Sequence, residues 1–149
     1  MTKYLPSKSL VLYADDDTDD LELLKEVFDD YSTIIDLVTF KDGWSLLNYL
    51  ESLDPLQVQP GLVILDINMP LLNGKQTLQK LRNLPHFADI PAILFTTSTL
   101  PHEADFARRY KAGFLTKPVH QKHIQLLLDQ MMEYCGEELK AKIRKHRGH

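Results

Sequence analysis

Four places in the sequence carry polar side chains whose types could perform chemistry together. They are Asp15 with Asp16, Asp66, Thr96, and Lys117. Each follows a short apolar run of strand length, and the carboxyl ends of parallel strands meet along one edge of a sheet. Three carboxylates at one edge repel one another, which raises their pKa values unless a cation lies among them. These residues therefore indicate a divalent metal site with a hydroxyl and an ammonium beside it.

Mg²⁺ is the cation that best suits such a set of oxygen ligands. We expect Asp16 and Asp66 to be direct ligands, and Asp15 to act through a bound water. The backbone carbonyl of Asn68 is expected to complete the protein's share of the coordination.

Asp66 is the expected nucleophile of a phosphoryl transfer. The metal and Lys117 would neutralise charge on the equatorial oxygens, and the Thr96 hydroxyl would donate a further hydrogen bond. Asp66 would then form an aspartyl phosphate. The sequence contains no Gly-x-x-x-x-Gly-Lys loop, no Gly-x-Ser-x-Gly elbow and no paired His–Cys arrangement. It therefore does not indicate a conventional enzyme.

Five apolar runs alternate with five segments of helical periodicity. The runs predict strands at residues 10–14, 35–40, 62–65, 92–95 and 113–116. Apolar residues at helical spacing predict helices at about residues 21–31, 44–50, 75–84, 101–111 and 119–131.

This alternation predicts an α/β fold, a doubly wound five-stranded parallel sheet with helices on both faces. Right-handed crossovers restrict the winding, and 2-1-3-4-5 is the common strand order for five strands. In that order the first, third, fourth and fifth strands are neighbours, so the polar residues at their ends converge on one crevice.

Length and composition narrow the class of protein. At 149 residues the chain is expected to form one domain, and its net charge of −4 gives no bias toward nucleic acid. A single cysteine, Cys135, excludes an internal disulfide and suits a reducing compartment. No apolar run reaches the length of a signal peptide core or a membrane span. We therefore expect a cytoplasmic protein with no membrane partner.

These motifs together resemble the receiver domain of two-component response regulators. The resemblance rests on Asp15-Asp16, on Leu65 to Pro70 with Gly74, on Thr96-Thr97 and on Lys117-Pro118, and it extends over about residues 9–134. It implies a flavodoxin-like fold and Mg²⁺-dependent phosphorylation of Asp66 by a sensor histidine kinase or a histidine phosphotransfer protein. It also implies a cis bond between Lys117 and Pro118, and a switch formed by Thr96 and Phe114.

The resemblance implies a stand-alone response regulator that is not an enzyme beyond self-catalysed phosphotransfer and dephosphorylation at Asp66. Its output would be altered affinity for a protein partner that the sequence does not name, or passage of the phosphoryl group along a relay. Tyr110 to Gly113 depart from the family's usual Gly-Ala pair, so we expect the fourth helix to be shortened or re-capped at its end. Asn68 and Ser98 occupy positions where the family tunes the lifetime of its phosphoryl group.

Two functions of other classes remain open. A Mg²⁺-dependent phosphohydrolase would form the same aspartyl phosphate, but that family usually has a second Asp where this chain has Asn68. A degenerate receiver used only for protein interaction would not need Asp15, Asp16, Asp66, Thr96 and Lys117 together.

The ends of two helices carry charge that we interpret as solvated. Asp19, Asp20 and Glu22 are expected to form an exposed helix start.

We expect a receiver domain at residues 1–136 and a basic helical extension or tail at 137–149, with no effector domain. The alternative for the tail is a docking or dimer-forming segment, since Leu139 and Ile143 are spaced i, i+4. About a dozen residues are too few for a helix-turn-helix domain, so no specific nucleic acid partner is expected.

Overall fold

The computed structural model describes residues 8–118 and 124–148 of the chain. Its strands are β1 (Ser9–Ala14), β2 (Ile35–Phe40), β3 (Leu62–Asp66), β4 (Ala92–Thr96) and β5 (Gly113–Thr116). Its helices are α1 (Thr18–Asp29), α2 (Gly43–Ser52), α3 (Gly74–Arg82), α4 (Pro101–Arg109), α5 (Ile124–Met132) and α6 (Glu137–His146). The first part of the helix predicted at residues 119–131 lies outside the described residues.

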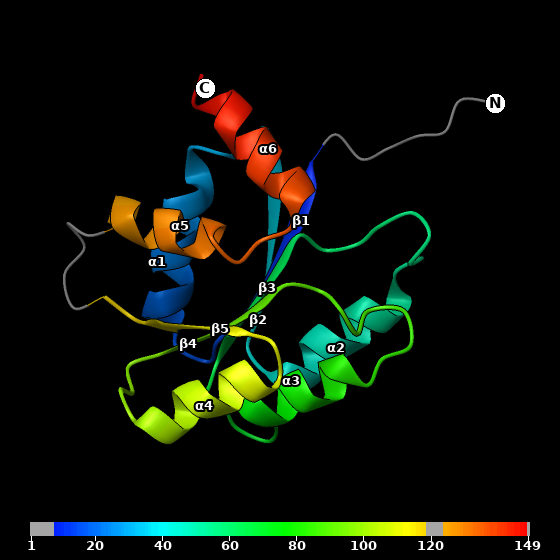
Figure 1. The fold of residues 1–149 in the computed structure, drawn as a ribbon, viewed down its shortest axis with the longest axis vertical. Helices are drawn as coiled ribbons and strands as arrows, with labels where there is room; N and C mark the ends of the chain where they lie inside the picture. Colours follow the sequence, from blue (N-terminus) through cyan, green and yellow to red (C-terminus); the bar gives the residue numbers. More distant parts are fainter. Residues whose placement is uncertain (1–7, 119–123, 149) are drawn as a thin grey trace.

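The five strands form one parallel sheet in the order β2-β1-β3-β4-β5, which confirms the predicted topology (Figure 1). All five residues of β3 and all five of β4 are buried. Continuous apolar runs are what strands covered on both faces require, since both sets of alternating side chains pack against helices. None of the helices within residues 8–118 and 124–148 is long and apolar enough to cross a membrane.

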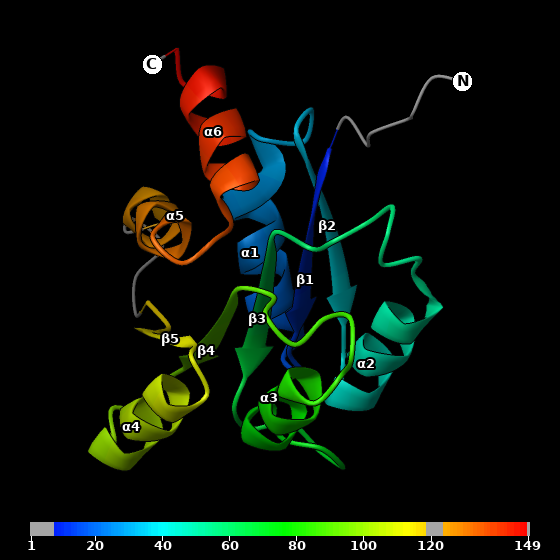
Figure 2. The same ribbon diagram turned by 45° about the vertical axis from the view of Figure 1, so that its right-hand side comes forward.

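Helices cover both faces of the sheet, and the alternation along β3 divides the core in two (Figure 2). Leu62 and Ile64 pack into a cluster with apolar residues of α1, α5 and α6. Val63 and Leu65 point to the opposite face, where they pack with residues of α2, α3 and α4. The sheet is therefore held from both sides, and its carboxyl edge is a rigid support for the residues that follow each strand.

Helix α6 packs into the core. Leu139 and Ile143 are both buried in the cluster that contains α1 and α5. The Gly136 N–H, at the start of the helix, donates to the Gly61 carbonyl at 3.0 Å. At the other end, Arg147 donates to the Tyr31 hydroxyl at 2.8 Å. The sequence favours a solvated extension, whereas in the structure this helix packs on the core. The reason is the i, i+4 spacing of Leu139 and Ile143, which puts both apolar side chains on one face of the helix.

Gly74 allows the start of α3 to pack directly against the end of β3. A Cβ at this position would lie 2.2 Å from the carbonyl oxygen of Asp66, well inside van der Waals contact. The helix start is fixed by a capping box, in which Asn73 and Gln76 each accept from the other's backbone N–H. The backbone around Asp66 is thus positioned by a contact that only glycine permits.

We predict that Gly74→Ala lowers the free energy of unfolding by about 2–3 kcal/mol, because the new methyl group overlaps backbone that cannot move aside. Urea denaturation followed by circular dichroism measures this change. Gly136→Ala is the matched control: its Cβ would meet nothing closer than 3.8 Å, so we expect a loss below about 1 kcal/mol. Equal losses in the two variants would contradict the steric explanation.

Helix α4 ends two residues before the predicted boundary, at a turn that usually requires glycine. Lys111 has a φ of 59°, and its N–H donates to the Arg108 carbonyl at 3.1 Å. The next residue, Ala112, donates to the Ala107 carbonyl at 2.8 Å. This pair of bonds is a Schellman motif, in which a left-handed residue satisfies the last helical carbonyls. The Arg82 guanidinium donates to the carbonyls of the turn, which holds a lysine in a conformation it rarely adopts.

Lys111→Gly is expected to raise the free energy of unfolding by about 0.5–1 kcal/mol, since glycine adopts the left-handed conformation without steric cost. Thermal unfolding measures the change. Arg109→Gly, at the last residue of α4 and also exposed, serves as the control and is expected to lower stability by about 1 kcal/mol. A loss of stability in Lys111→Gly would show that the turn is not strained.

Candidate functional site

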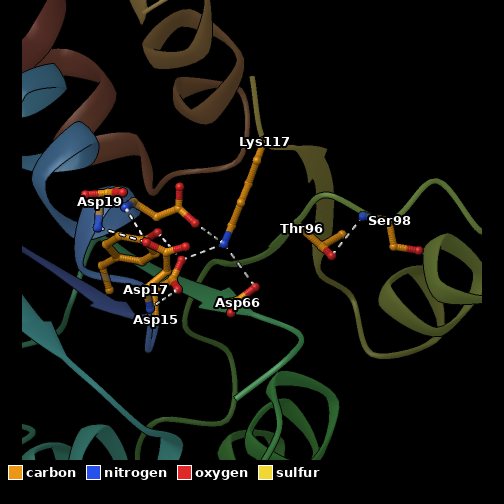
Figure 3. A network of polar contacts seen from close by, with 9 residues as sticks. Asp15, Asp17, Asp19, Asp66, Thr96, Ser98 and Lys117 are labelled. Carbon is orange, nitrogen blue, oxygen red and sulfur yellow. Dashed lines mark hydrogen bonds and ion pairs between the residues drawn. The ribbon is translucent and has the colours of Figure 1, made fainter. Parts of the chain in front are cut away.

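The carboxyl ends of four strands bring the predicted site residues to one edge of the sheet. Asp15 follows β1, Asp66 and Thr96 end β3 and β4, and Lys117 follows β5. Figure 3 shows Lys117 extending toward Asp15 and Asp66. All four of these residues are buried. Their convergence follows from the strand order, because β1, β3, β4 and β5 are adjacent in the sheet.

Three carboxylates lie close enough to share one cation. Asp15, Asp16 and Asp66 each offer an oxygen within 4.8 Å of the other two. Burial, followed by repulsion from Asp15, raises the pKa of Asp66 to about 7, although the Lys117 ammonium lowers it in part. Asp15 and Asp66 are buried, and Asp16 is exposed at the edge of the cluster. Carboxylates that repel one another are the donor set that a hard divalent cation satisfies. The residues therefore fit a divalent metal.

Both oxygens of Asp15 are already engaged by protein donors. Its Oδ1 accepts from the Asp17 N–H at 2.9 Å. Its Oδ2 accepts from the Tyr13 hydroxyl at 2.5 Å and from Lys117 Nζ at 2.7 Å. Tyr13 is fully buried on β1 and packs edge-to-face with Phe95. Burial, followed by the charge of Asp15, raises the pKa of the Tyr13 hydroxyl, so it stays protonated and donates.

Lys117 is the one cation in this network among the described residues, and it contacts three carboxylates. Its Nζ lies 2.7 Å from Asp15, 2.7 Å from Asp20 and 3.2 Å from Asp66. Burial disfavours the ammonium, but hydrogen bonds to Asp15 and Asp20 outweigh burial and raise the pKa of Lys117 above its ordinary value. Lys117 is therefore charged at neutral pH, and each carboxylate it touches comes from a different element.

Thr96 lies beside the cluster, whereas Phe114 packs elsewhere in the core (Figure 3). Thr96 is fully buried, and its hydroxyl oxygen accepts from the Ser98 N–H at 3.1 Å. Within the described residues, no hydrogen bond joins Thr96 to a carboxylate or to Lys117. Phe114 on β5 is partly buried and packs against the second core cluster, and Asn68 is exposed in the loop after β3. The roles of these three residues remain predictions.

The expected cis bond between Lys117 and Pro118 is absent, since the described residues contain no cis peptide bond. The trans isomer is intrinsically favoured at prolines by about 0.5–1 kcal/mol. In this isomer the Lys117 side chain already reaches all three carboxylates.

Two residues of the network were not identified from the sequence. Tyr13 was interpreted as part of an apolar strand, although residues two apart on a strand share a face and Tyr13 precedes Asp15 by two. Asp20 was interpreted as a solvated acid at a helix start. Nothing local in the sequence signals its contact with Lys117, which lies 97 residues away.

The fold and the site define a class of protein: a doubly wound parallel α/β domain with an acidic cluster and a buried lysine at the carboxyl edge of its sheet. The chain belongs to the response regulator receiver domain family, which its sequence matches over residues 11–146. Members of this family act as phosphoacceptors in two-component signalling.

Several known proteins resemble the chain. Response regulator Rcp1 of Synechocystis is 26% identical over 120 residues, covering 77% of this chain and 80% of Rcp1. The structure of the phosphorylated cyanobacterial phytochrome response regulator RcpA matches the fold with a TM-score of 0.75 at 20% identity, over 85% of this chain and 93% of RcpA. Chemotaxis protein CheV1 of Helicobacter pylori is 27% identical over 85% of this chain, which spans 39% of the length of CheV1.

The raised pKa of Asp66 predicts a pH-dependent effect of Asp66→Asn on the metal-free protein. An acid whose pKa is higher when folded destabilises the fold above that pKa, and the penalty vanishes below its unfolded value. Asp66→Asn should therefore be more stable than the wild type at pH 8, by about 1–2 kcal/mol once solvent screening is allowed for. The difference should shrink as the pH falls through about 7 toward 4. Urea denaturation in a chelating buffer measures this, and a difference independent of pH would contradict it.

Proposed function

We propose that the chain is a phosphoacceptor switch in which Asp66 receives a phosphoryl group from a phosphohistidine. The donor would be a sensor histidine kinase or a histidine phosphotransfer protein. The observation that carries the proposal is the position of the buried Lys117, whose Nζ lies 3.2 Å from Oδ1 of the buried Asp66, in a cluster that also contains Asp15 and the exposed Asp16. An ammonium fixed beside the nucleophile suits a transfer in which negative charge must be neutralised.

Three side chains of the protein have roles in the proposed phosphoryl transfer. An Asp66 carboxylate oxygen attacks phosphorus, the bond from phosphorus to the histidine nitrogen breaks, and its electron pair returns to the imidazole. Lys117 donates to a phosphoryl oxygen, and the Thr96 hydroxyl donates to another. The same contacts would support hydrolysis of the aspartyl phosphate, the self-catalysed dephosphorylation proposed for this chain.

Mg²⁺ is the divalent cation that we propose for the cluster, with Asp16 and Asp66 as direct ligands and the Asn68 carbonyl as a third. Asp15 would act through water, because both of its oxygens already accept hydrogen bonds from the protein. When bound, the cation would neutralise charge on the phosphoryl oxygens. A Mn²⁺-bound form of the relative Rcp1 supports a divalent cation here.

The proposed output is a change in protein–protein affinity. The Thr96 hydroxyl oxygen accepts from the Ser98 N–H, and a phosphoryl group on Asp66 would give the Thr96 O–H an acceptor of its own. Phe114 would follow by turning inward. Such a group can only shift an equilibrium between two states that it binds differently. The proposed partners are the phosphodonor protein and a downstream protein or second copy of the chain that recognises the altered α4–β5–α5 surface.

Intact mass spectrometry after incubation with acetyl phosphate tests the proposal. We expect one phosphoryl adduct in the presence of Mg²⁺, none in its absence, and none in Asp66→Asn. Asp54→Asn removes an exposed carboxylate distant from the cluster and should be phosphorylated like the wild type. An adduct in Asp66→Asn, or none in the wild type, would overturn Asp66 as the phosphoacceptor.

A further inference from the structure

The Lys117 ammonium has three N–H donors, and three carboxylates surround it. Asp15 and Asp20 accept at 2.7 Å each, and Asp66 lies somewhat farther away at 3.2 Å. The side chain passes the Phe95 ring, with Nζ 5.7 Å from the ring centroid. Two of the three N–H groups are fixed by hydrogen bonds to Asp15 and Asp20, which also fixes the direction of the third. Asp66 lies within ion-pair distance of this ammonium.

Asp20 differs from the other two acceptors because it stands outside the metal cluster. The three carboxylates that could share a cation are Asp15, Asp16 and Asp66. Within the described residues, Lys117 is the only hydrogen-bond partner of the Asp20 carboxylate. A metal bound to the cluster would draw on Asp15 and Asp66 and repel Lys117, whereas Asp20 would keep its contact with the ammonium.

The start of α1 places Asp20 accurately. Asp17 caps the helix, and its carboxylate accepts from the N–H groups of Asp19 and Asp20. The Asp17 N–H in turn donates to Asp15. The first turn of α1 is thus tied to the end of β1, and the position of Asp20 relative to Asp15 is set by backbone contacts.

We propose that Asp20 is a positioning residue that, together with Asp15, directs the third N–H of Lys117 at Asp66 and at a phosphoryl group carried there. This inference rests on the proposed function of Asp66. It assigns a role to an acid in the first turn of α1 that never touches the phosphoryl group.

Positioning and simple charge make opposite predictions for Asp20. A negative charge near the site repels an anionic phosphodonor, so removing it should accelerate phosphorylation if charge were the only effect. Loss of the Asp20 carboxylate as an acceptor would leave the Lys117 ammonium free to adopt other orientations, which should slow phosphorylation. An asparagine at this position keeps an acceptor oxygen but no charge, and an alanine keeps neither.

The experiment compares Asp20→Ala and Asp20→Asn with Asp19→Ala and Asp19→Asn. Asp19 lies in the same helical turn, is exposed, and has no side-chain hydrogen bond within the described residues, so it matches the change in charge and in helix dipole. The rate of adduct formation with acetyl phosphate and Mg²⁺ is measured by intact mass. The Lys117 ammonium is followed by ¹⁵N NMR, where an immobilised, hydrogen-bonded ammonium exchanges its protons slowly.

We expect Asp20→Ala to slow adduct formation about tenfold and to lose the slowly exchanging Lys117 signal. Asp20→Asn should retain the signal and stay within about threefold of the wild type, and both Asp19 variants should match the wild type or react slightly faster. Equal acceleration in all four variants, or an unchanged Lys117 signal in Asp20→Ala, would overturn the positioning role. Failure of the wild type to form an adduct would instead overturn the proposed function itself.

Discussion

The burial of one ammonium among carboxylates is the constraint on which the site depends. An unpaired charge in the interior is far more costly than one in water, so Lys117 can be buried only where acids surround it. Its three acceptors come from the end of β1, the first turn of α1 and the end of β3. The end of β5 is thereby joined to three other elements by ion pairs.

The same arrangement leaves the site short of positive charge. Within the described residues, Lys117 is the one ammonium of a cluster that contains the carboxylates of Asp15, Asp16, Asp20 and Asp66. Burial, followed by repulsion from Asp15, raises the pKa of Asp66. A divalent cation is the simplest way to stabilise its ionised form. The cluster thus favours the binding of a cation, and two of its acids stand at the ends of central strands whose residues are buried on both faces.

Sequence reasoning predicted the sheet and the convergence of Asp15, Asp66, Thr96 and Lys117, because uninterrupted apolar runs identify central strands and strand order then places their ends together. It did not identify Tyr13, since a phenol within an apolar run normally indicates core. It misinterpreted Asp20, because helix starts are commonly acidic and solvated, and only the three-dimensional path of Lys117 distinguishes this acid from Asp19. The cis bond implied by family resemblance was also wrong.

Helix α6 is part of the compact domain. Leu139 and Ile143 belong to the same core cluster as residues of β1 and β3, and Leu139 lies against the backbone of Gly61. A chain shortened before Glu137 would leave an apolar opening at the edge where the strands begin, a surface of the kind that promotes self-association. A domain boundary placed at residue 136 would therefore remove two residues of the hydrophobic core, Leu139 and Ile143.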